Sequence, residues 1–245
     1  MDSRLPRLAC ISITVLCVLA DPAWAQENPA QTVQRAGVAH GVSSGSAETL
    51  NSVADGTLTV FLSGGGRTTY AVRLLSKGRM MVHRIITQPG GKLRHGSDGT
   101  RRWASVDETF FMEAQGLDRA FIESQTARSV LTFLTSPNLV LRNLGKRNNA
   151  TVIEAADGNS HTTSYYIDDR TSLVTRFEFS TGQSKDIAGR SMLDVETYVF
   201  SDFRSVQGRV VPFKTERYLN SIKSEEVQFS SVSYPTSLSN DLFRP

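Results

Sequence analysis

The sequence has 245 residues, of which 27 are Lys or Arg and 24 are Asp or Glu, so its formal net charge at pH 7 is +3. The basic clusters at 92–102 and 142–147 carry no interleaved stacking aromatics, which argues against a nucleic-acid-binding surface. The two cysteines, Cys10 and Cys17, both precede the expected start of the mature chain. This excludes a disulfide framework, a thiol nucleophile and a cysteine metal site.

The first 25 residues have the pattern of a cleaved signal peptide. Arg4 and Arg7 form a positive segment, and an apolar run of about 13 residues at 8–20 follows it. The run is too short to span a bilayer, which takes roughly 20 residues. A small-x-small site ends at Ala25, so we expect cleavage before Gln26 and export to the periplasm.

A lipid anchor at Cys17 is the alternative, but Leu16 precedes it where a small residue is normal. We therefore expect an exported protein with no membrane span after signal removal, and any contact with a membrane at its surface only. Its core must stabilise it without disulfides. A mature chain of about 220 residues is long enough, because it buries about 70% of its unfolded surface.

Residues 26–52 are small and polar, with weak helical patterns around 29–37 and 47–53, and form a poorly determined N-terminal segment. Residues 53–245 are expected to form one domain, which begins with strands at 57–62, 68–74 and 79–87. The glycine-rich loop at 63–66 predicts a hairpin rather than a phosphate site, because no helix follows it. A second hairpin, 92–95 with 101–105, is expected to close at Asp98-Gly99.

An apolar insertion interrupts the strands. Residues 108–114 and 117–134 mix Phe, Leu, Ile and Val with Glu, Gln and Arg at helical spacing, and Pro137 ends the pattern. These helices are too apolar to stand free. We expect them to lie against the concave face of a curved antiparallel sheet.

The remainder of the chain alternates apolar and polar residues, bounded by Gly, Asp and Asn. This period of two is typical of antiparallel strands with one face buried. The predicted class is mainly β (α+β). The expected strands are 138–144, 150–155, 161–167, 173–180, 193–203, 210–219 and 225–234.

Residues suited to catalysis are scattered. His40, His83, His95 and His161 form no metal-binding spacing. The pair Asp168-Asp169 is better explained as a turn. Glu225 and Glu226 point to opposite faces of a strand. We expect no enzyme activity, no metal and no cofactor.

Four stretches together resemble the LolA/LolB-like periplasmic lipoprotein-carrier superfamily. They are the strand-turn-strand run 198–218, the ending 229–245, and the turns at 98–103 and 166–174. The resemblance covers most of 53–245, and its motifs are strand-and-turn patterns rather than catalytic signatures.

The resemblance implies an open antiparallel half-barrel of about 10 or 11 strands, with helices as a lid over an apolar cavity that receives acyl chains. Ordinary core packing is the alternative role for each residue of the expected lining. That lining is Leu58, Val60, Leu62, Tyr70, Val72, Phe177, Phe179, Phe213 and Phe229 on strands, with Phe110, Phe111 and Phe121 on the lid.

Two functions remain open. The first is a cell-envelope protein that binds or carries a hydrophobic ligand, such as a lipid or lipoprotein acyl chain. The second is an interaction or sensory module that docks an envelope protein partner with the same half-barrel. An unrecognised hydrolase is a weaker third alternative.

Overall fold

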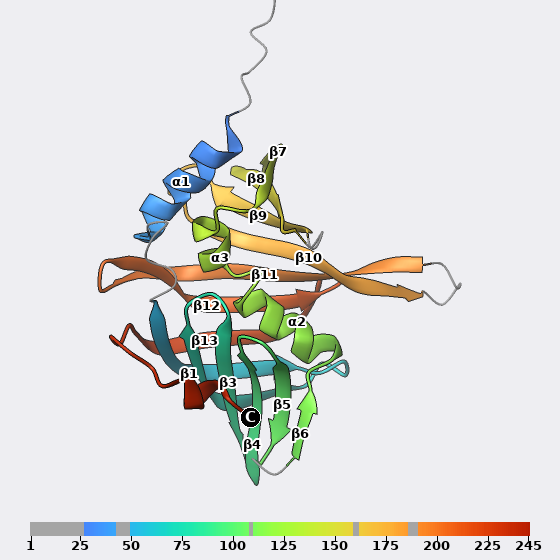
Figure 1. Ribbon diagram of the computed structural model, residues 1–245. Coiled ribbons are helices and arrows are strands. Elements are labelled where there is room, and N and C mark those ends of the chain that lie inside the picture. The colour runs from blue at the N-terminus through green and yellow to red at the C-terminus, as the bar shows by residue number, and fades with distance from the viewer. Residues whose placement is uncertain (1–26, 43–49, 108–109, 159–161, 186–190) are drawn as a thin grey trace, which may run out of the picture.

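The computed structural model describes residues 27–42, 50–107, 110–158, 162–185 and 191–245 (Figure 1). Most of this chain is strand. The strands are β1 (Asn51–Phe61), β2 (Arg67–Lys77), β3 (Met81–Gln88), β4 (Gly91–Asp98), β5 (Arg102–Val106), β6 (Phe110–Glu113), β7 (Val140–Arg147), β8 (Ala150–Ala156), β9 (Thr162–Asp168), β10 (Val174–Lys185), β11 (Ser191–Val206), β12 (Arg209–Leu219) and β13 (Ile222–Ser233).

All of these strands belong to one antiparallel sheet of 13 strands, in the order β6-β5-β4-β3-β2-β1-β13-β12-β11-β10-β9-β8-β7. Every neighbour is a hairpin partner except β1 and β13, which join the two halves of the chain at the centre. The sheet is open, with β6 and β7 as its edges. The expected mainly β, open antiparallel architecture is confirmed, with 13 strands in place of 10 or 11.

Three α-helices and a short 3₁₀-helix complete the described part of the fold. They are α1 (Pro29–His40), α2 (Gly116–Gln125), α3 (Val130–Thr135) and η2 (Asn240–Phe243). The connection from β6 to β7 carries α2 and α3 across the sheet, and α1 packs on α3, β7 and β12 (Figure 1). We call this helix-bearing side the inner face and the opposite side the outer face. No helix in the described ranges is long and apolar enough to cross a bilayer.

The helical interpretation of 108–114 is wrong for Phe110–Glu113, which form strand β6. Its backbone pairs with β5, with Phe110 opposite Val106 and Glu113 opposite Trp103. Aromatic residues fit a pleated surface well, and β6 satisfies the hydrogen-bonding edge that β5 would otherwise expose. A four-residue segment is too short for its pattern to separate helix from strand.

The predicted helix 117–134 is in fact two helices. α2 ends at Gln125, and the Thr126 hydroxyl donates to the carbonyl of Ile122 at 2.8 Å. α3 begins after Ser129, whose side chain accepts from the backbone N–H of Thr132. Local hydrogen bonds from Ser and Thr compete with helix continuation, which explains the break.

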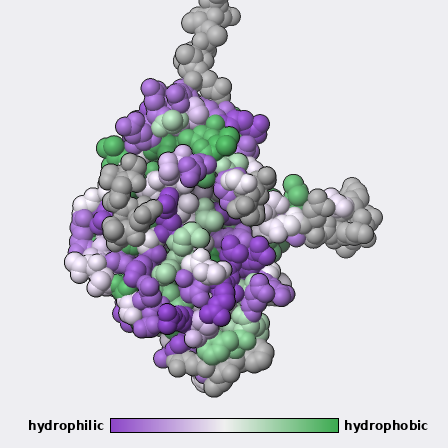
Figure 2. Space-filling view, in the orientation of Figure 1, coloured by the Kyte–Doolittle hydropathy of each residue, from purple (hydrophilic) through white to green (hydrophobic). Residues whose placement is uncertain are grey.

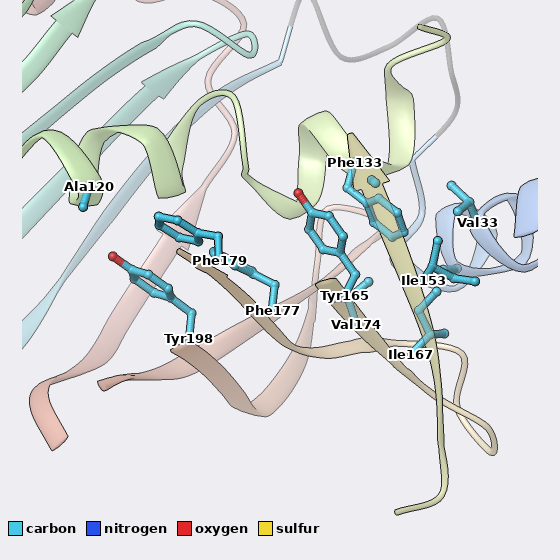
Figure 3. Packing of buried hydrophobic residues seen from close by; sticks show 12 residues of the cluster. Val33, Ala120, Phe133, Ile153, Tyr165, Ile167, Val174, Phe177, Phe179 and Tyr198 are labelled. Atoms are coloured by element: carbon cyan, nitrogen blue, oxygen red, sulfur yellow. The ribbon is translucent and has the colours of Figure 1, made fainter. Parts of the chain in front are cut away.

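One half of the inner face is a filled core (Figure 3). Over β8–β11, Phe133 of α3 stacks on Tyr165 with ring centroids 3.8 Å apart, and Phe177 stacks on Tyr198 at 4.9 Å. Val33 of α1 closes the cluster from the side. These rings and aliphatic groups are buried, so the helices are joined to this half of the sheet by apolar packing.

On the outer face, the C-terminal segment covers β3–β5. Phe243 is fully buried there, and its carbonyl accepts from the indole N–H of Trp103 at 3.0 Å. The His83 ring lies edge-on to Trp103 at 5.1 Å and contacts the carbonyl of Leu242. His83 therefore has a structural role in holding the C-terminus.

Candidate ligand-binding cavity

A cavity of about 240 Å³ lies between the helices and the middle of the inner face. α3 contributes three aliphatic residues to its wall, and β1, β2 and β10–β13 supply most of the remainder. An apolar concavity with a few polar groups is the usual form of a small-molecule site. The lining consists of Val42, Leu50, Ala54, Leu74, Val130, Leu131, Leu134, Val174, Phe177, Phe200, Val210, Val211, Pro212, Phe229, Val232 and Tyr234, with Gly78 and the polar His40, Ser52, Ser76, Ser124, Gln125, Ser129 and Arg209.

Beside the cavity, the C-terminal end of α1 lies directly against the sheet. Gly41 ends α1 with φ +69°, and a Cβ on it would lie 2.2 Å from the carbonyl oxygen of Gly208 in the β11–β12 turn. The His40 ring joins the same contact, with Nδ1 2.9 Å from the carbonyl of Val210 and Nε2 accepting from the Val174 N–H. Both ring nitrogens are therefore occupied, and burial lowers the pKa of His40, which leaves it neutral.

A second cavity of about 60 Å³ lies beneath α2. It adjoins the first, because Leu74, Gln125 and Phe229 line both. Its wall differs in character, since Arg84, Arg217 and Glu225 take part in it. The apolar space therefore ends against a group of charges.

These charges form a buried network on β3, β11, β12 and β13. Arg217 binds Glu196 with two hydrogen bonds, at 2.6 and 2.9 Å, and also donates to Glu225 at 3.2 Å. Glu225 accepts from Arg84 at 2.9 Å. The Tyr198 hydroxyl donates to Glu196 at 3.0 Å. Two guanidinium groups thus neutralise two carboxylates, as buried charges require.

The network also binds α2 to the sheet. Arg217 donates to the carbonyl of Leu117 at 3.1 Å, and the Arg84 guanidinium lies 3.6 Å from the centre of the Phe121 ring. The His95 ring lies between Arg84 and Asp118 of α2. Its Nδ1 is 2.9 Å from Nη2 of Arg84, and its Nε2 is 3.3 Å from a carboxylate oxygen of Asp118. Burial, and secondarily the positive charge of Arg84, lowers the pKa of His95 to about 3, so this link is made by a neutral imidazole.

Four of the residues expected to line a cavity do so. Phe177 lines the larger cavity, Val72 and Phe121 line the smaller one, and Phe229 lines both. Phe121 does not face an empty gap, however, because it is buried beneath the Arg84 guanidinium.

Five other expected residues lie elsewhere. Leu58, Val60 and Tyr70 pack in a cluster with Val72 toward the β1–β2 hairpin, and these three residues line neither cavity. Phe179 belongs to the filled core under Arg128. Leu62 follows β1 and is 55% exposed.

Phe213 and the residues of β6 are also outside the cavities. Phe213 is buried beneath Arg204, at 4.3 Å, and lines neither space. Phe111 is not on the lid. It stands opposite Ser105 in β6, and its ring packs edge-on to Trp103 of the outer face at 6.5 Å. The Phe110 side chain, Ala25 and Gln26 lie outside the described residues.

The inward-pointing charges escaped the sequence analysis. Arg84 lies two residues from the buried Val82 and two from the buried Ile86, on the same face of β3. Glu196 likewise shares a face of β11 with the buried Tyr198, two residues later. A charge where the period of two requires an apolar residue was the available signal. Within the described residues, no group of three or more His, Cys, Asp or Glu is placed to hold a metal ion.

Comparisons with known proteins bear on the fold. No protein-family profile and no curated protein matches the sequence. Solved structures do. A domain from Vibrio parahaemolyticus described as an outer membrane lipoprotein-sorting protein superposes with a TM-score of 0.58 at 15% identity, over 88% of this chain and 98% of its own.

Two further structures agree with it. A DUF1329 family protein from Desulfovibrio piger gives a TM-score of 0.56 at 14% identity, and a LolA superfamily protein from Nitrosomonas europaea gives 0.54 at 12%. Each comparison spans 89% of this chain and 98% of the other. The open 13-stranded sheet with its helix-covered inner face is therefore the LolA-like fold of lipoprotein-sorting proteins.

Proposed function

We propose that this protein is an exported cell-envelope protein that binds a hydrophobic chain, from a lipid or lipoprotein, in the larger cavity. The observation that carries this proposal is an apolar space of about 240 Å³ between α1, α3 and the inner face. The filled core over β8–β11 borders this space and confines it to the middle of the inner face. The LolA-like fold of solved lipoprotein-sorting proteins adds support.

The size of the space limits the ligand. Pockets for drug-sized ligands occupy about 300–1,000 Å³, and 240 Å³ lies just below that range. One chain fits better than a multi-chain lipid anchor. Each methylene transferred from water contributes about 0.8 kcal/mol, so even a short chain has a useful binding free energy after its ordering cost.

A cavity-filling variant tests the proposal. Ala54 is buried on β1 and lines the cavity, so Ala54→Leu places three extra carbons in the space. We expect this variant to lose binding of a fluorescent fatty-acid probe, while the midpoint of its unfolding transition stays unchanged. Ala71→Leu is the matched control, because Ala71 is exposed on β2. Equal probe binding by both variants would refute binding in this cavity.

Export is the second part of the proposal. The signal pattern supports cleavage between Ala25 and Gln26 and release into the periplasm. Intact mass measurement of protein recovered from the periplasmic fraction tests it. A mass that retains residues 1–25 would contradict it.

We assign binding rather than catalysis to the chain. His83 and His95, on the neighbouring strands β3 and β4, are engaged in structural contacts with backbone or with neighbouring side chains and lie outside the larger cavity. Replacing either by Gln should leave cellular function intact wherever folding is preserved. Loss of function at an unchanged melting temperature would restore the enzyme hypothesis.

A docking module is the second candidate, favoured by the β6 edge. Phe111 and Met112 there are 45% and 48% exposed, and hydrophobic surface is visible at the β5–β6 end of the sheet (Figure 2). Exposed apolar groups on a sheet edge are a typical site for strand addition by a protein partner. If no lipid in a broad panel binds the protein, this candidate takes precedence.

A further inference from the structure

We infer that the ligand of the larger cavity is a single-chain amphiphile with an anionic head, a carboxylate or a phosphate, and that Arg209 binds the head. This inference rests on the proposed function and adds the charge of the ligand to it. Arg209 is the first residue of β12, directly after the turn that contacts the end of α1. Of the described residues that line the cavity, it alone carries a formal charge at pH 7.

Among the residues that the structure describes, no carboxylate forms an ion pair with Arg209. Its Nε is buried and has no hydrogen-bond partner within the described residues. Its guanidinium lies 4.4 Å from the ring centre of Tyr234, which also lines the cavity. Stacking on an aromatic ring orients a guanidinium but leaves its N–H donors available.

The other arginines of the inner face differ in this respect. Arg217 binds Glu196, Arg84 binds Glu225, and Arg128 has a carboxylate oxygen of Glu123 at 3.5 Å. The fold thus pairs its buried cations wherever they have a structural role, because a desolvated charge without a partner is costly. Arg209 is half-buried, with its Nε fully covered, and its partner is an oxyanion that arrives with the ligand.

The geometry separates head from tail. A guanidinium donates two parallel hydrogen bonds to a carboxylate or phosphate. Away from Arg209, the space is bounded by aliphatic and aromatic side chains and adjoins the smaller cavity at Leu74 and Phe229. An amphiphile with its head at Arg209 would place its chain among these apolar groups.

Calorimetric titration with decanoate, decyl phosphate and decanol tests the inference, with inorganic phosphate as the headgroup alone. We expect both anions to bind wild type about ten to a hundred times more tightly than decanol, as expected for hydrogen bonds to a charged group. Arg209→Gln should reduce the affinity for both anions to that for decanol and leave decanol binding unchanged. Arg209→Lys should retain most of the preference, and Arg204→Gln, which removes an exposed arginine that already binds Asp202, should change nothing.

The outcomes are distinguishable. A larger affinity for one anion than the other identifies the headgroup within the proposed class. Equal binding of decanol and both anions to wild type would overturn this inference and leave the proposed function standing. Failure of all three chains to bind would overturn both.

If Arg209→Gln lowers stability and decanol affinity together while Arg209→Lys does not restore the anion preference, the arginine is a structural partner of the α1 terminus and the inference is wrong. Tight binding of inorganic phosphate alone would also contradict the role of the chain.

Discussion

Replacement of Glu196 by Gln should be the most destabilising isosteric change in this protein. Glu196 is 0% exposed and accepts two hydrogen bonds from Arg217 and one from Tyr198. The amide removes one negative charge and turns an NH₂ group toward donors. Arg84 and Arg217 are then left with Glu225 as their shared carboxylate.

The magnitude follows from burial. Removing one partner of a buried ion pair costs about 3–5 kcal/mol, because the other charge stays desolvated. With a urea m-value of about 2–3 kcal/mol/M, the unfolding midpoint should fall by roughly 1–2.5 M. A loss of this size is a large share of the 5–15 kcal/mol that holds a typical domain folded.

Urea unfolding followed by the fluorescence of Trp103, which is buried against the C-terminal segment, measures this change. Glu154→Gln is the matched control, since Glu154 pairs with Arg142 at the surface, and it should cost under about 1 kcal/mol. In a double-mutant cycle, Glu196→Gln with Arg217→Gln should cost clearly less than the sum of the two single changes. Equal midpoints for Glu196→Gln and the control would refute the reasoning.

Three other changes have definite expected outcomes. Gly41→Ala should lower the free energy of unfolding by at least about 1–2 kcal/mol, because a side chain in the left-handed region carries that cost and because the Gly208 carbonyl is close. Gly64→Ala, in open space, should not lower it, and equal melting temperatures for the two variants would contradict the α1 contact. Ala155→Leu should cost about 1–3 kcal/mol by overpacking the filled core, while Ala54→Leu should not, and equal costs in urea unfolding would mean that the space at Ala54 is not available. Acidification from pH 7.5 to 5.5 should destabilise the fold, since burial lowers the pKa of His40, His83 and His95 below 6.5 and the unfolded chain then binds protons first. Each contributes stability that is present above pH 6.5 and is lost as the pH falls toward the folded-state pKa, by about 1.4 kcal/mol per pH unit for His95, so a flat urea midpoint over this range would be inconsistent with three buried neutral imidazoles.

Much of the fold could be predicted from local patterns. The alternation in 150–234 predicted β8 through β13, because successive side chains of a strand point to opposite faces whatever the strand pairs with. Turn residues located the hairpins equally well, as at Asp98, whose carboxylate accepts from the N–H groups of Thr100 and Arg101. Both signals depend only on neighbours in the chain.

The candidate site was predictable only in part. Phe177 and Phe179 alternate identically on β10 and both belong to the filled core, yet only Phe177 also lines the cavity. Leu58 and Phe229 share the same pattern on β1 and β13, and again only Phe229 reaches the space. Alternation identifies the face of a residue and not what stands opposite it.

By itself, the sequence determined the fold class, the strand and turn positions, the existence of an apolar lid segment and the pattern of an export signal. Tertiary structure decided the remainder. The β6 strand forms because β5 offers an unpaired edge, and the ion pairs of Arg217 form because the sheet register sets it opposite Glu225 and beside Glu196. The cavity lies where α3 and the end of α1 meet the sheet, and the position of that end is fixed by contacts such as Gly41 with Gly208, which are far apart in the chain. Long-range contacts of this kind leave no periodic trace in the sequence, because only folding brings the partners together.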